Sequence, residues 1–372
     1  MSQILFLVSS MEGGGAERVA ALLSNHWVAQ GHQVTLMPTF SGRGDCSYAL
    51  DERVRLDYLA DRVGSRSGSP LNKLRRMMAL RRAIRDEPPA VVLSFLPHVN
   101  VAAVVASLGL RVPVVVSERI YPPAMPLGAV LERLRRWAYA RATKVVVQTE
   151  ETREWLACSC PGARVHVIAN PLVYPLPQSQ PRVDPDHIVG HARPLALAVG
   201  RLEKQKGFDL LIAAFQRLSR KYSTWDLAIL GEGIERPQLE RYIESLGLTD
   251  RIFFAGRAGN LADWYTRADF YVMSSRFEGF PNTLLEAMAY GLPAVSFDCQ
   301  AGPRDIIRDG VDGLLVAPDA GVSGLSAAME RLMGNGELRR QMSDEAVSVR
   351  ERFALEQIAA QWDVVLGLRR AQ

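Results

Sequence analysis

Residues 269–298 read DFYVMSSRFEGFPNTLLEAMAYGLPAVSFD, and this stretch decides the fold. It begins and ends with short apolar runs, 269–274 and 293–298, in which apolar and polar side chains do not alternate. Such runs predict strands that are buried on both faces. Between them lies a helix candidate at 282–290, which Gly291 ends. A strand, a helix and a second strand in this order predict a parallel βαβ unit.

The same alternation of apolar runs and amphipathic stretches continues in both directions. The other predicted strands are 4–10, 33–38, 54–59, 90–96, 112–118, 144–149 and 165–170, followed by 194–200, 225–231, 251–256 and 313–318. Helix candidates include 16–30, 70–85, 127–142, 207–221, 235–246, 260–267 and 321–333, with a final helical region from 338 to 368. Strands and helices that alternate in this way predict an α/β protein with parallel sheets.

The domain organisation follows from length and from one interruption. A chain of 372 residues predicts two or three domains. Several prolines and no steady period mark a break near residues 171–194. We therefore expect an N-terminal Rossmann-like domain over 1–172, a proline-rich linker over 173–194 and a second Rossmann-like domain over 195–352. The two domains are expected to face a central cleft, with ligands at the carboxyl ends of the strands.

Composition narrows the class of protein. The chain is 48% hydrophobic and 23% charged, which excludes disordered and fibrous proteins. No apolar run approaches the roughly 18 residues of a membrane-spanning helix. The first apolar run is expected to be a strand rather than a signal peptide. Cys158 and Cys160 complete no zinc-site pattern, and four cysteines without a disulfide framework fit a reducing cytoplasm.

Charge is unevenly divided. Residues 1–172 hold 21 lysines and arginines against 14 acids, a net charge of +7, whereas the remainder has a net charge of −3. Six cations fall in 71–85, and a similar mixture recurs at 131–137. Basic amphipathic helices suit an anionic membrane surface. The alternative is an ordinary helix with a core stripe and a solvated face. No motif that reads RNA or DNA accompanies the charge, so nucleic acid is not an expected partner.

Two loops after predicted strands could hold phosphate. Met11-Glu12-Gly13-Gly14-Gly15 follows the first strand, and its glycines allow close backbone approach at a helix start. A plain tight turn is the alternative there. Gly200-Arg201-Leu202-Glu203-Lys204-Gln205-Lys206-Gly207 follows the first strand of the second domain. Arg201 and Lys206 suit a diphosphate, whereas Lys204 is expected to be solvated.

The stretch 269–298 carries the most informative residues. Its helix starts at Pro281 or Asn282, so the backbone N–H groups of Thr283 and Leu284 are expected to bind phosphate oxygens. Glu286 lies about one turn inside the helix, where a carboxylate can accept hydrogen bonds from a ribose diol. Glu278 precedes the helix and can reach a sugar hydroxyl. The alternative for Glu286 is an acid that complements the helix dipole.

These residues resemble a known family. Glu278 and Glu286 form an E-x7-E motif, and they occur with Gly200-Arg201-Leu202, Lys206, Gly231-Glu232-Gly233 and Gly256-Arg257. Together they look like the retaining, nucleotide-sugar-dependent glycosyltransferases of the family-four group, which have the GT-B fold. The resemblance covers nearly the whole chain and is strongest over 198–316.

The resemblance implies a set of roles. Arg201 and Lys206 would bind the donor diphosphate, Glu286 the ribose and Glu278 the transferred sugar. Backbone amides around Gly14, Gly15 and Asn282-Thr283-Leu284 would contact phosphate, and Arg257 would lie beside the nucleobase. The final helix, within 353–372, would pack back on the N-terminal domain. We identify no Asp-x-Asp signature of the metal-dependent kind, and we expect neither a metal nor another cofactor.

The sequence departs from the family at one position. Many members carry a histidine after the fifth strand of the first domain, where this chain reads Ser117-Glu118-Arg119. Glu118 or Arg119 is therefore expected to replace that histidine or to contact the acceptor. His98, in Ser94-Phe95-Leu96-Pro97-His98, is the nearby alternative, although it can equally cap a helix. The run Ser94-Phe95-Leu96 followed later by Ser117-Glu118 is similar to that of a bacterial subgroup that adds N-acetylhexosamines to lipid-linked or lipopolysaccharide saccharides.

The expected function is thus a metal-independent, retaining transfer of an N-acetylhexosamine from a UDP-sugar to a membrane-linked glycan. The expected location is the cytoplasm, peripherally on the inner face of the cytoplasmic membrane. One alternative is a mannosyl- or glucosyltransferase with a GDP- or ADP-linked donor. Another is a non-catalytic nucleotide-sugar-binding protein. A nicotinamide-dependent enzyme would need the GxGxxG fingerprint, which the first domain lacks.

Overall fold

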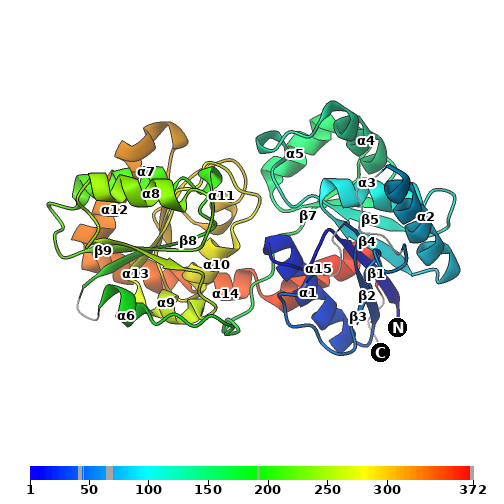
Figure 1. Cartoon of the computed structure of the whole chain (residues 1–372), viewed down its shortest axis with the longest axis horizontal. Helices are drawn as coiled ribbons and strands as arrows, with labels where there is room; N and C mark the ends of the chain where they lie inside the picture. The colour runs from blue at the N-terminus through cyan, green and yellow to red at the C-terminus, as the bar shows by residue number, and fades with distance from the viewer. Residues whose placement is uncertain (41–43, 45, 64–69, 191–192, 369–372) are drawn as a thin grey trace. The chain divides into compact units, whose positions relative to one another are not determined.

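The computed structural model describes residues 1–40, 44, 46–63, 70–190 and 193–368. The chain divides into two compact units. Unit 1 comprises Met1–Pro171 and Leu355–Gln372, and unit 2 comprises Leu172–Ala354. Each unit is a parallel sheet with helices on both faces, as Figure 1 shows.

The sheet of unit 1 has seven parallel strands in the order β3-β2-β1-β4-β5-β6-β7. The strands are β1 (Gln3–Val8), β2 (Gln33–Pro38), β3 (Arg55–Leu56), β4 (Val91–Phe95), β5 (Val114–Ser117), β6 (Lys144–Val147) and β7 (Val165–Val167). Each overlaps a strand predicted from the apolar runs. In the central register, Ile4 of β1 faces Val34 of β2 and Val91 of β4. These side chains are buried, as expected for a sheet that is covered on both faces.

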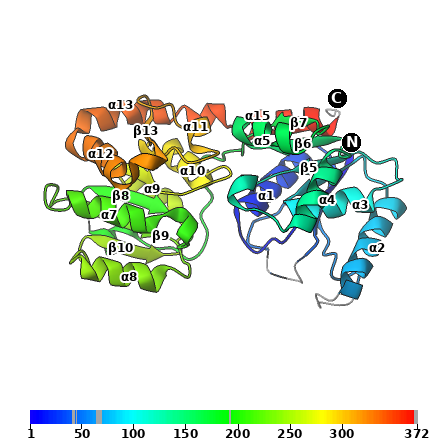
Figure 2. The same cartoon turned by 90° about the horizontal axis from the view of Figure 1, so that it is seen from above.

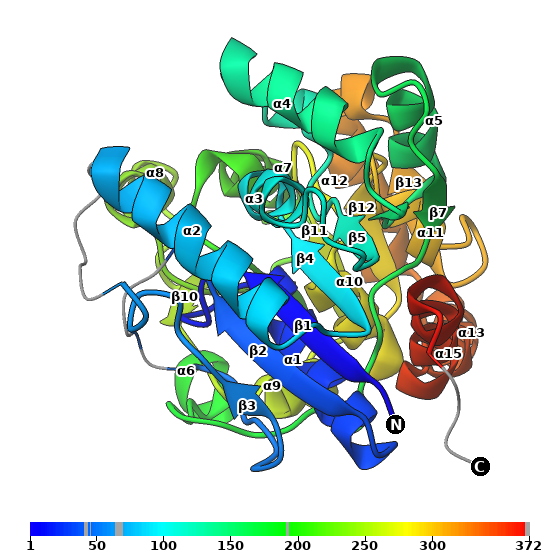
Figure 3. The ribbon, with the colours of Figure 1, turned by 90° about the vertical axis from the view of Figure 1, so that its right-hand side faces the viewer.

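Two groups of helices cover this sheet (Figure 3). One face packs against α1 (Gly15–Ala29) and the last helix, α15 (Leu355–Leu366). The other packs against α2 (Pro70–Asp86), α3 (Pro97–Ala106), α4 (Ala129–Tyr139) and α5 (Glu150–Ser159). A short 3-10 turn, η1 (Pro122–Ala124), follows β5.

The helix α15 is tied to unit 1 by buried aromatic side chains. Trp362 is fully buried and lies 5.9 Å from the Phe95 ring of β4. The indole N–H of Trp27, from α1, donates to Asp363 at 3.0 Å.

The helical region predicted over 338–368 is not one helix. It consists of α13 (Gly336–Ala346), α14 (Val349–Arg352) and α15, and the break before α15 occurs where Phe353 accepts a backbone hydrogen bond from Leu172.

The sheet of unit 2 has six parallel strands in the order β10-β9-β8-β11-β12-β13. The strands are β8 (Leu195–Val199), β9 (Asp226–Leu230), β10 (Ile252–Gly256), β11 (Phe270–Met273), β12 (Ala294–Phe297) and β13 (Gly313–Val316). The remaining elements are α6 (Pro185–Val189), η2 (Lys204–Lys206), α7 (Phe208–Leu218), α8 (Arg236–Ser245), α9 (Leu261–Arg267), α10 (Asn282–Ala289), α11 (Pro303–Ile306), η3 (Pro318–Ala320) and α12 (Gly321–Gly334). Figure 2 shows α7 and α12 side by side, and with α8 they bury one face of the sheet. The βαβ unit predicted over 269–298 is formed by β11, α10 and β12.

The segment predicted as a linker, 173–194, lies in unit 2. It forms α6 and is tied to α9 through Val183. The backbone N–H of Val183 donates to Asn260, and the Val183 carbonyl accepts from Asn260 and from the Trp264 indole. This part of the segment is therefore packed against α9.

The strand orders define one ligand edge in each unit. In both sheets the first strand lies between the second and the fourth, so β1 neighbours β4 and β8 neighbours β11. This is the doubly wound arrangement in which the chain reverses its direction of travel across the sheet. Ligands of such sheets bind at the carboxyl ends of the strands beside the reversal.

Candidate functional site

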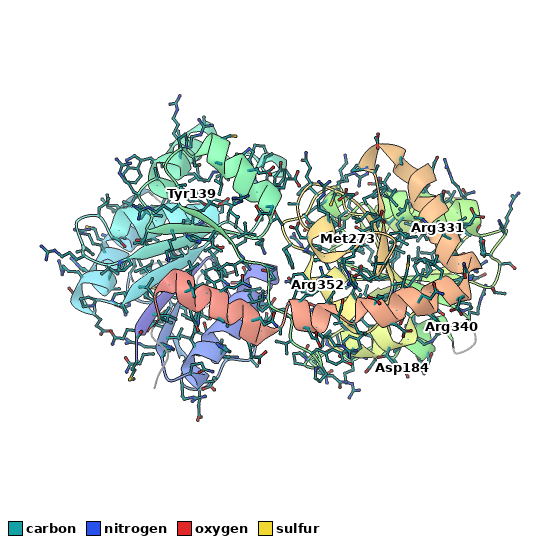
Figure 4. The ribbon with its side chains drawn as sticks, turned by 180° about the vertical axis from the view of Figure 1, so that it is seen from behind. Tyr139, Asp184, Met273, Arg331, Arg340 and Arg352 are labelled. Carbon is teal, nitrogen blue, oxygen red and sulfur yellow. The ribbon has the colours of Figure 1, made fainter. Side chains whose placement is uncertain are left out.

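In unit 2 the loops after β8 and β11 meet at this edge. Met273, labelled in Figure 4, is the last residue of β11, and Glu278 and α10 follow it. Gly200 to Gly207 follows β8. Gly207 has φ 64°, and a Cβ there would overlap the carbonyl oxygen of Ser274. Only glycine therefore allows the two loops to approach so closely.

The central contact of the site is an ion pair. Nζ of Lys206 lies 2.6 Å from Oε1 of Glu278, and both side chains are largely buried. The Ser275 hydroxyl donates to the same oxygen at 2.6 Å. In the part of the chain that the structure describes, Oε2 of Glu278 accepts no hydrogen bond, which leaves it for a ligand.

Backbone and side-chain hydrogen bonds hold the two loops together. The Ser274 hydroxyl donates to the Lys206 carbonyl at 2.9 Å, and the Gln205 side-chain amide donates to the Phe277 carbonyl at 2.9 Å. Arg276 adds a two-point ion pair with Asp209, the second residue of α7, at 2.9 and 2.7 Å. The position of Lys206 beside Glu278 is thus set by contacts on both sides of the pair.

The start of α10 lies in the same region. Pro281 is the N-cap and provides no side-chain cap, and the Leu285 amide is the one that donates back to the Pro281 carbonyl. The amides of residues 282–284 therefore belong to the first turn, where N–H groups have no acceptor within the helix. Thr283 is anchored through its hydroxyl, which accepts from Tyr271 at 2.9 Å. Glu286 is buried one turn further on, and the Tyr265 hydroxyl donates to it at 3.3 Å.

Two neutral groups border the ion pair. Burial raises the pKa of the Cys299 thiol to about 12, so it stays protonated and is a poor nucleophile. Burial likewise raises the pKa of Tyr271, whose hydroxyl therefore remains a hydrogen-bond donor to Thr283. The charge in this part of the site thus comes from Lys206, Glu278 and Glu286.

The two other cations predicted for the donor lie outside this cluster. Arg201 follows β8, but its side chain is 68% exposed and pairs with Glu203 at 2.9 Å. Arg257 follows β10 and is exposed. Among the described residues, neither makes a hydrogen bond with Lys206, Glu278 or Glu286. Arg201 and Arg257 would therefore have to reach a ligand from exposed positions around the site.

The predicted phosphate contacts Gly14 and Gly15 belong to unit 1, as does His98. Gly14 is the N-cap of α1, and Gly15 is its first residue. The Gly14 amide already donates to the Tyr48 hydroxyl at 2.8 Å, so a phosphate would have to share or replace that contact. His98 lies at the edge where β1 and β4 are neighbours, and its Nε2 is 3.1 Å from the Ser9 hydroxyl. His98 therefore follows β4 and touches the residue that follows β1.

Glu118, the unit 1 residue predicted to be catalytic, is enclosed within that unit. It is 2% exposed and accepts a short hydrogen bond from Tyr139, which Figure 4 labels on α4. Arg135 of α4 lies 3.4 Å away and also pairs with Glu132 at 2.6 Å. Asn100 joins Tyr139 to the Ser117 carbonyl. These contacts tie α4 to the end of β5, and they occupy both carboxylate oxygens of Glu118, whereas Lys206 and Ser275 share one oxygen of Glu278.

Several partners were not predicted from the sequence. Ser275, Tyr265 and Tyr271 each bond to a predicted site residue. Ser275 carried a weak signal, because it directly follows a strand beside the reversal. The tyrosines carried none, since aromatic residues in apolar runs are ordinary core residues.

One Asp-x-Asp triplet serves a structural role. The sequence does contain an Asp-x-Asp triplet, Asp184-Pro185-Asp186. Asp184 caps α6 by accepting the Asp186 amide at 3.0 Å, and Asp186 pairs with Arg267 at 2.8 Å. Both carboxylates thus serve the packing of α6 against α9.

Comparisons with known proteins agree with this architecture. Residues 180–349 match the family model described as glycosyl transferases group 1, and residues 13–172 match glycosyltransferase family 4. An exopolysaccharide phosphotransferase of Streptomyces coelicolor is 30% identical over 97% of this chain, which spans 40% of that relative. An α-1,4-N-acetyl-D-galactosaminyltransferase of Campylobacter jejuni, named for an undecaprenol diphosphate-linked acceptor, is 25% identical over 97% of both chains. The structure of HepE from Anabaena with UDP and glucose has a TM-score of 0.82 and 19% identity, and the match covers 99% of this chain and 100% of that one.

We predict that Glu118→Gln gains stability over the wild type as pH rises from 5 to 8. Burial raises the pKa of Glu118 from 4.5 to about 7, against the opposing effects of Arg135 and Tyr139. A carboxyl with a raised pKa contributes stability that is fully present below its unfolded pKa and is lost as pH rises through the folded pKa. The glutamine amide does not titrate in this range, and its single carbonyl oxygen can still accept from Tyr139, so the variant lacks this loss. Thermal midpoints at both pH values measure the difference.

Glu132→Gln is the matched control, because it removes the other acidic partner of Arg135 from a more exposed position. It should show no such gain over this range. A Glu118→Gln difference that stays constant or shrinks between pH 5 and 8 would contradict the prediction.

Proposed function

Because the chain belongs to the group 1 glycosyltransferases, with two Rossmann-like units of the GT-B fold, we propose that it is a retaining, UDP-sugar-dependent enzyme. The sugar that it transfers is an N-acetylhexosamine, and the acceptor is a membrane-linked bacterial glycan. The observation that carries the donor site is the ion pair between Lys206 and Glu278, shortly before α10 begins at the reversal of the unit 2 sheet.

The proposed donor lies with its diphosphate at Lys206 and the first amides of α10. Negative charge grows on this diphosphate as the sugar leaves, so fixed N–H groups and a cation stabilise the transition state more than the ground state. Arg201 adds a second cation from the rim. Glu286 accepts the ribose hydroxyls, and the open oxygen of Glu278 accepts a sugar hydroxyl.

The proposed reaction is a front-face displacement. The bond between the anomeric carbon and the diphosphate oxygen breaks, and the acceptor oxygen bonds to the same face of that carbon. The departing phosphate oxygen takes the acceptor's proton, so no separate base is required. Lys206 and the α10 amides supply the charge that a metal would otherwise supply, and the mechanism is proposed to be metal-independent. The enzyme's main task is then to position both substrates.

Two findings support the choice of substrates. The Campylobacter relative is named as an N-acetylgalactosaminyltransferase with a lipid diphosphate-linked acceptor, and HepE was solved with UDP. The run Ser94-Phe95-Leu96 followed by Ser117-Glu118 adds the resemblance to enzymes that transfer N-acetylhexosamines. A GDP- or ADP-linked donor is the alternative outcome of the donor test below.

We also propose that unit 1 binds an anionic membrane surface. No helix among the described residues is both long enough and apolar enough to cross a bilayer. Instead, α2 exposes Leu71, Leu74 and Met78, which are 57%, 56% and 44% accessible. The buried stripe of α2 runs instead through Leu80 and Ile84.

The cations of α2 fall into two groups. Arg76 and Arg81 donate to backbone carbonyls of Phe40 and Leu108, so they serve packing. Lys73, Arg75, Arg82 and Arg85 are exposed. Arg75 and Arg82 share the face of Leu71, Leu74 and Met78 by helical spacing. An apolar stripe edged by cations suits an anionic bilayer surface.

We predict that Lys206→Ala and Glu286→Ala each lower kcat/KM for sugar transfer by about 100-fold or more, the usual cost of removing a fixed donor to a developing anion. Lys204→Ala is the matched control, because Lys204 is exposed two residues away. A panel of labelled UDP-, GDP- and ADP-sugars is offered with lipid-linked saccharides extracted from bacterial membranes. A chelator should leave the rate unchanged, and NMR of the product should show the α-anomer of an α-linked donor.

Near wild-type transfer by Lys206→Ala or Glu286→Ala would overturn the site assignment. A β-linked product would overturn the retaining mechanism, and a preference for a GDP- or ADP-sugar would overturn the choice of UDP.

We predict that flotation with liposomes requires both anionic lipid and the exposed cations of α2. Reversing Arg75 and Arg82 to glutamate should weaken partitioning by about tenfold or more, since each basic residue near an anionic surface contributes about 1 kcal/mol. The control reverses Arg153 and Arg164, two exposed arginines elsewhere in unit 1. Flotation that is equal on neutral liposomes, or that both double variants lose equally, would contradict the membrane proposal.

A further inference from the structure

Glu118 and Arg119 follow β5 as consecutive residues, and their side chains have different surroundings. Glu118 contacts α4, as described above. The Arg119 guanidinium lies 4.3 Å from the centre of the Phe95 ring and donates one short hydrogen bond to Asn170. Arg119 is 6% exposed. It is therefore a second buried arginine in unit 1, besides Arg135.

The two buried arginines differ in their partners. Arg135 has carboxylates at 3.4 and 2.6 Å, from Glu118 and Glu132. Within the described residues, Arg119 has no carboxylate at ion-pair distance. Its Nε and Nη1 also have no hydrogen-bond partner there. Buried arginines are normally paired and fully hydrogen-bonded, so this one has unused binding capacity.

The location of Arg119 is the ligand edge of its sheet. Phe95 ends β4, and Gln148 follows β6 directly. Gln148 donates at 2.7 Å to the same Asn170 oxygen that Arg119 contacts, while its own Oε1 is buried without a partner. Arg119 thus lies among residues that follow several parallel strands, where doubly wound sheets bind ligands.

The electrostatics favour an anion at this place. Burial lowers the pKa of Arg119 to about 9, and Glu17 opposes this effect. The side chain therefore keeps its charge at neutral pH, in surroundings of low dielectric where an anion is attracted strongly. A planar guanidinium with two free N–H positions matches phosphate oxygens. Because Nε and Nη1 are covered, a ligand reaches them only when the side chains above them move aside.

We propose that Arg119 binds a phosphate group of a substrate at the carboxyl edge of the unit 1 sheet. This inference rests on the proposed function, in which both substrates carry phosphate. One source is the diphosphate of the nucleotide sugar, and the other is the phosphate that links the acceptor glycan to its lipid. Arg119, rather than Glu118, is then the residue after β5 that contacts substrate.

The experiment measures the affinity of the full-length protein for two probes, UDP and undecaprenyl phosphate in detergent. Arg119→Gln should weaken the binding of one probe by at least tenfold, and the probe that is affected identifies the source of the phosphate. Arg119→Lys keeps the charge without the planar fork, so it should recover part of the loss. Arg153→Gln, at an exposed arginine of α5, should bind both probes as the wild type does.

The unfolding temperature of Arg119→Gln distinguishes phosphate binding from a merely structural role. Because the uncompensated charge of Arg119 does not favour the free folded state, Arg119→Gln should unfold at the wild-type temperature or higher. If Arg119→Gln binds neither probe more weakly than the wild type, the proposal is wrong. The proposal also fails if Arg119→Gln does not fold and Arg119→Lys binds both probes normally. A wild type that transfers sugar while these variants bind normally refutes only this inference, whereas a wild type that binds no nucleotide sugar refutes the proposed function.

Discussion

The structure of the candidate site depends on one close contact between two loops. Gly207 passes against the Ser274 carbonyl, and this contact brings Lys206 to within 2.6 Å of Glu278. Strands that are buried on both faces leave polar groups only at their ends, so the chemistry of such a sheet gathers where two ends meet. The ion pair fixes a cation where a diphosphate would lie. Lys206 and Ser275 both donate to one oxygen of Glu278, and we propose that the other oxygen accepts from the ligand.

The ligand edge of unit 1 is built differently. Several of its polar and charged groups bond to one another, as in the network of Glu118, Tyr139 and Arg135. A buried carboxylate with such partners holds α4 in place but has little left for a substrate. Arg119 differs from Arg135, because its charge has no carboxylate partner among the described residues. Unit 2 thus offers a preformed pair of charges, and unit 1 offers a buried cation that has no carboxylate partner among the described residues.

Local sequence pattern predicted much of this architecture. Apolar runs predicted the strands of both sheets, because a strand buried on both faces has a simple signature. The spacing of Glu278 and Glu286 predicted one carboxylate before a helix and another one turn inside it. The pattern failed at 338–368, where a periodic helical stretch is broken twice. Helical period does not reveal where tertiary contacts end a helix, as the backbone bond from Leu172 to Phe353 does here.

The contacts within the site were harder to predict. The direct pairing of Lys206 with Glu278 joins residues that are 72 positions apart, and it depends on how two loops pack. The enclosure of Glu118 depends likewise on Tyr139 and Arg135, which come from a later helix. The exposed stripe of α2 was ambiguous because that helix has two apolar faces, and only packing decides which one is buried.

The central claim is that Lys206 and the start of α10 hold the diphosphate of the donor. The most direct measurement is a calorimetric titration of the wild type and of Lys206→Met with UDP and with uridine. The account predicts that UDP binds the wild type much more tightly than uridine does. It also predicts that Lys206→Met reduces this advantage at least tenfold while uridine binding is unchanged. A Lys206→Met variant that keeps the full advantage of UDP over uridine would contradict the account.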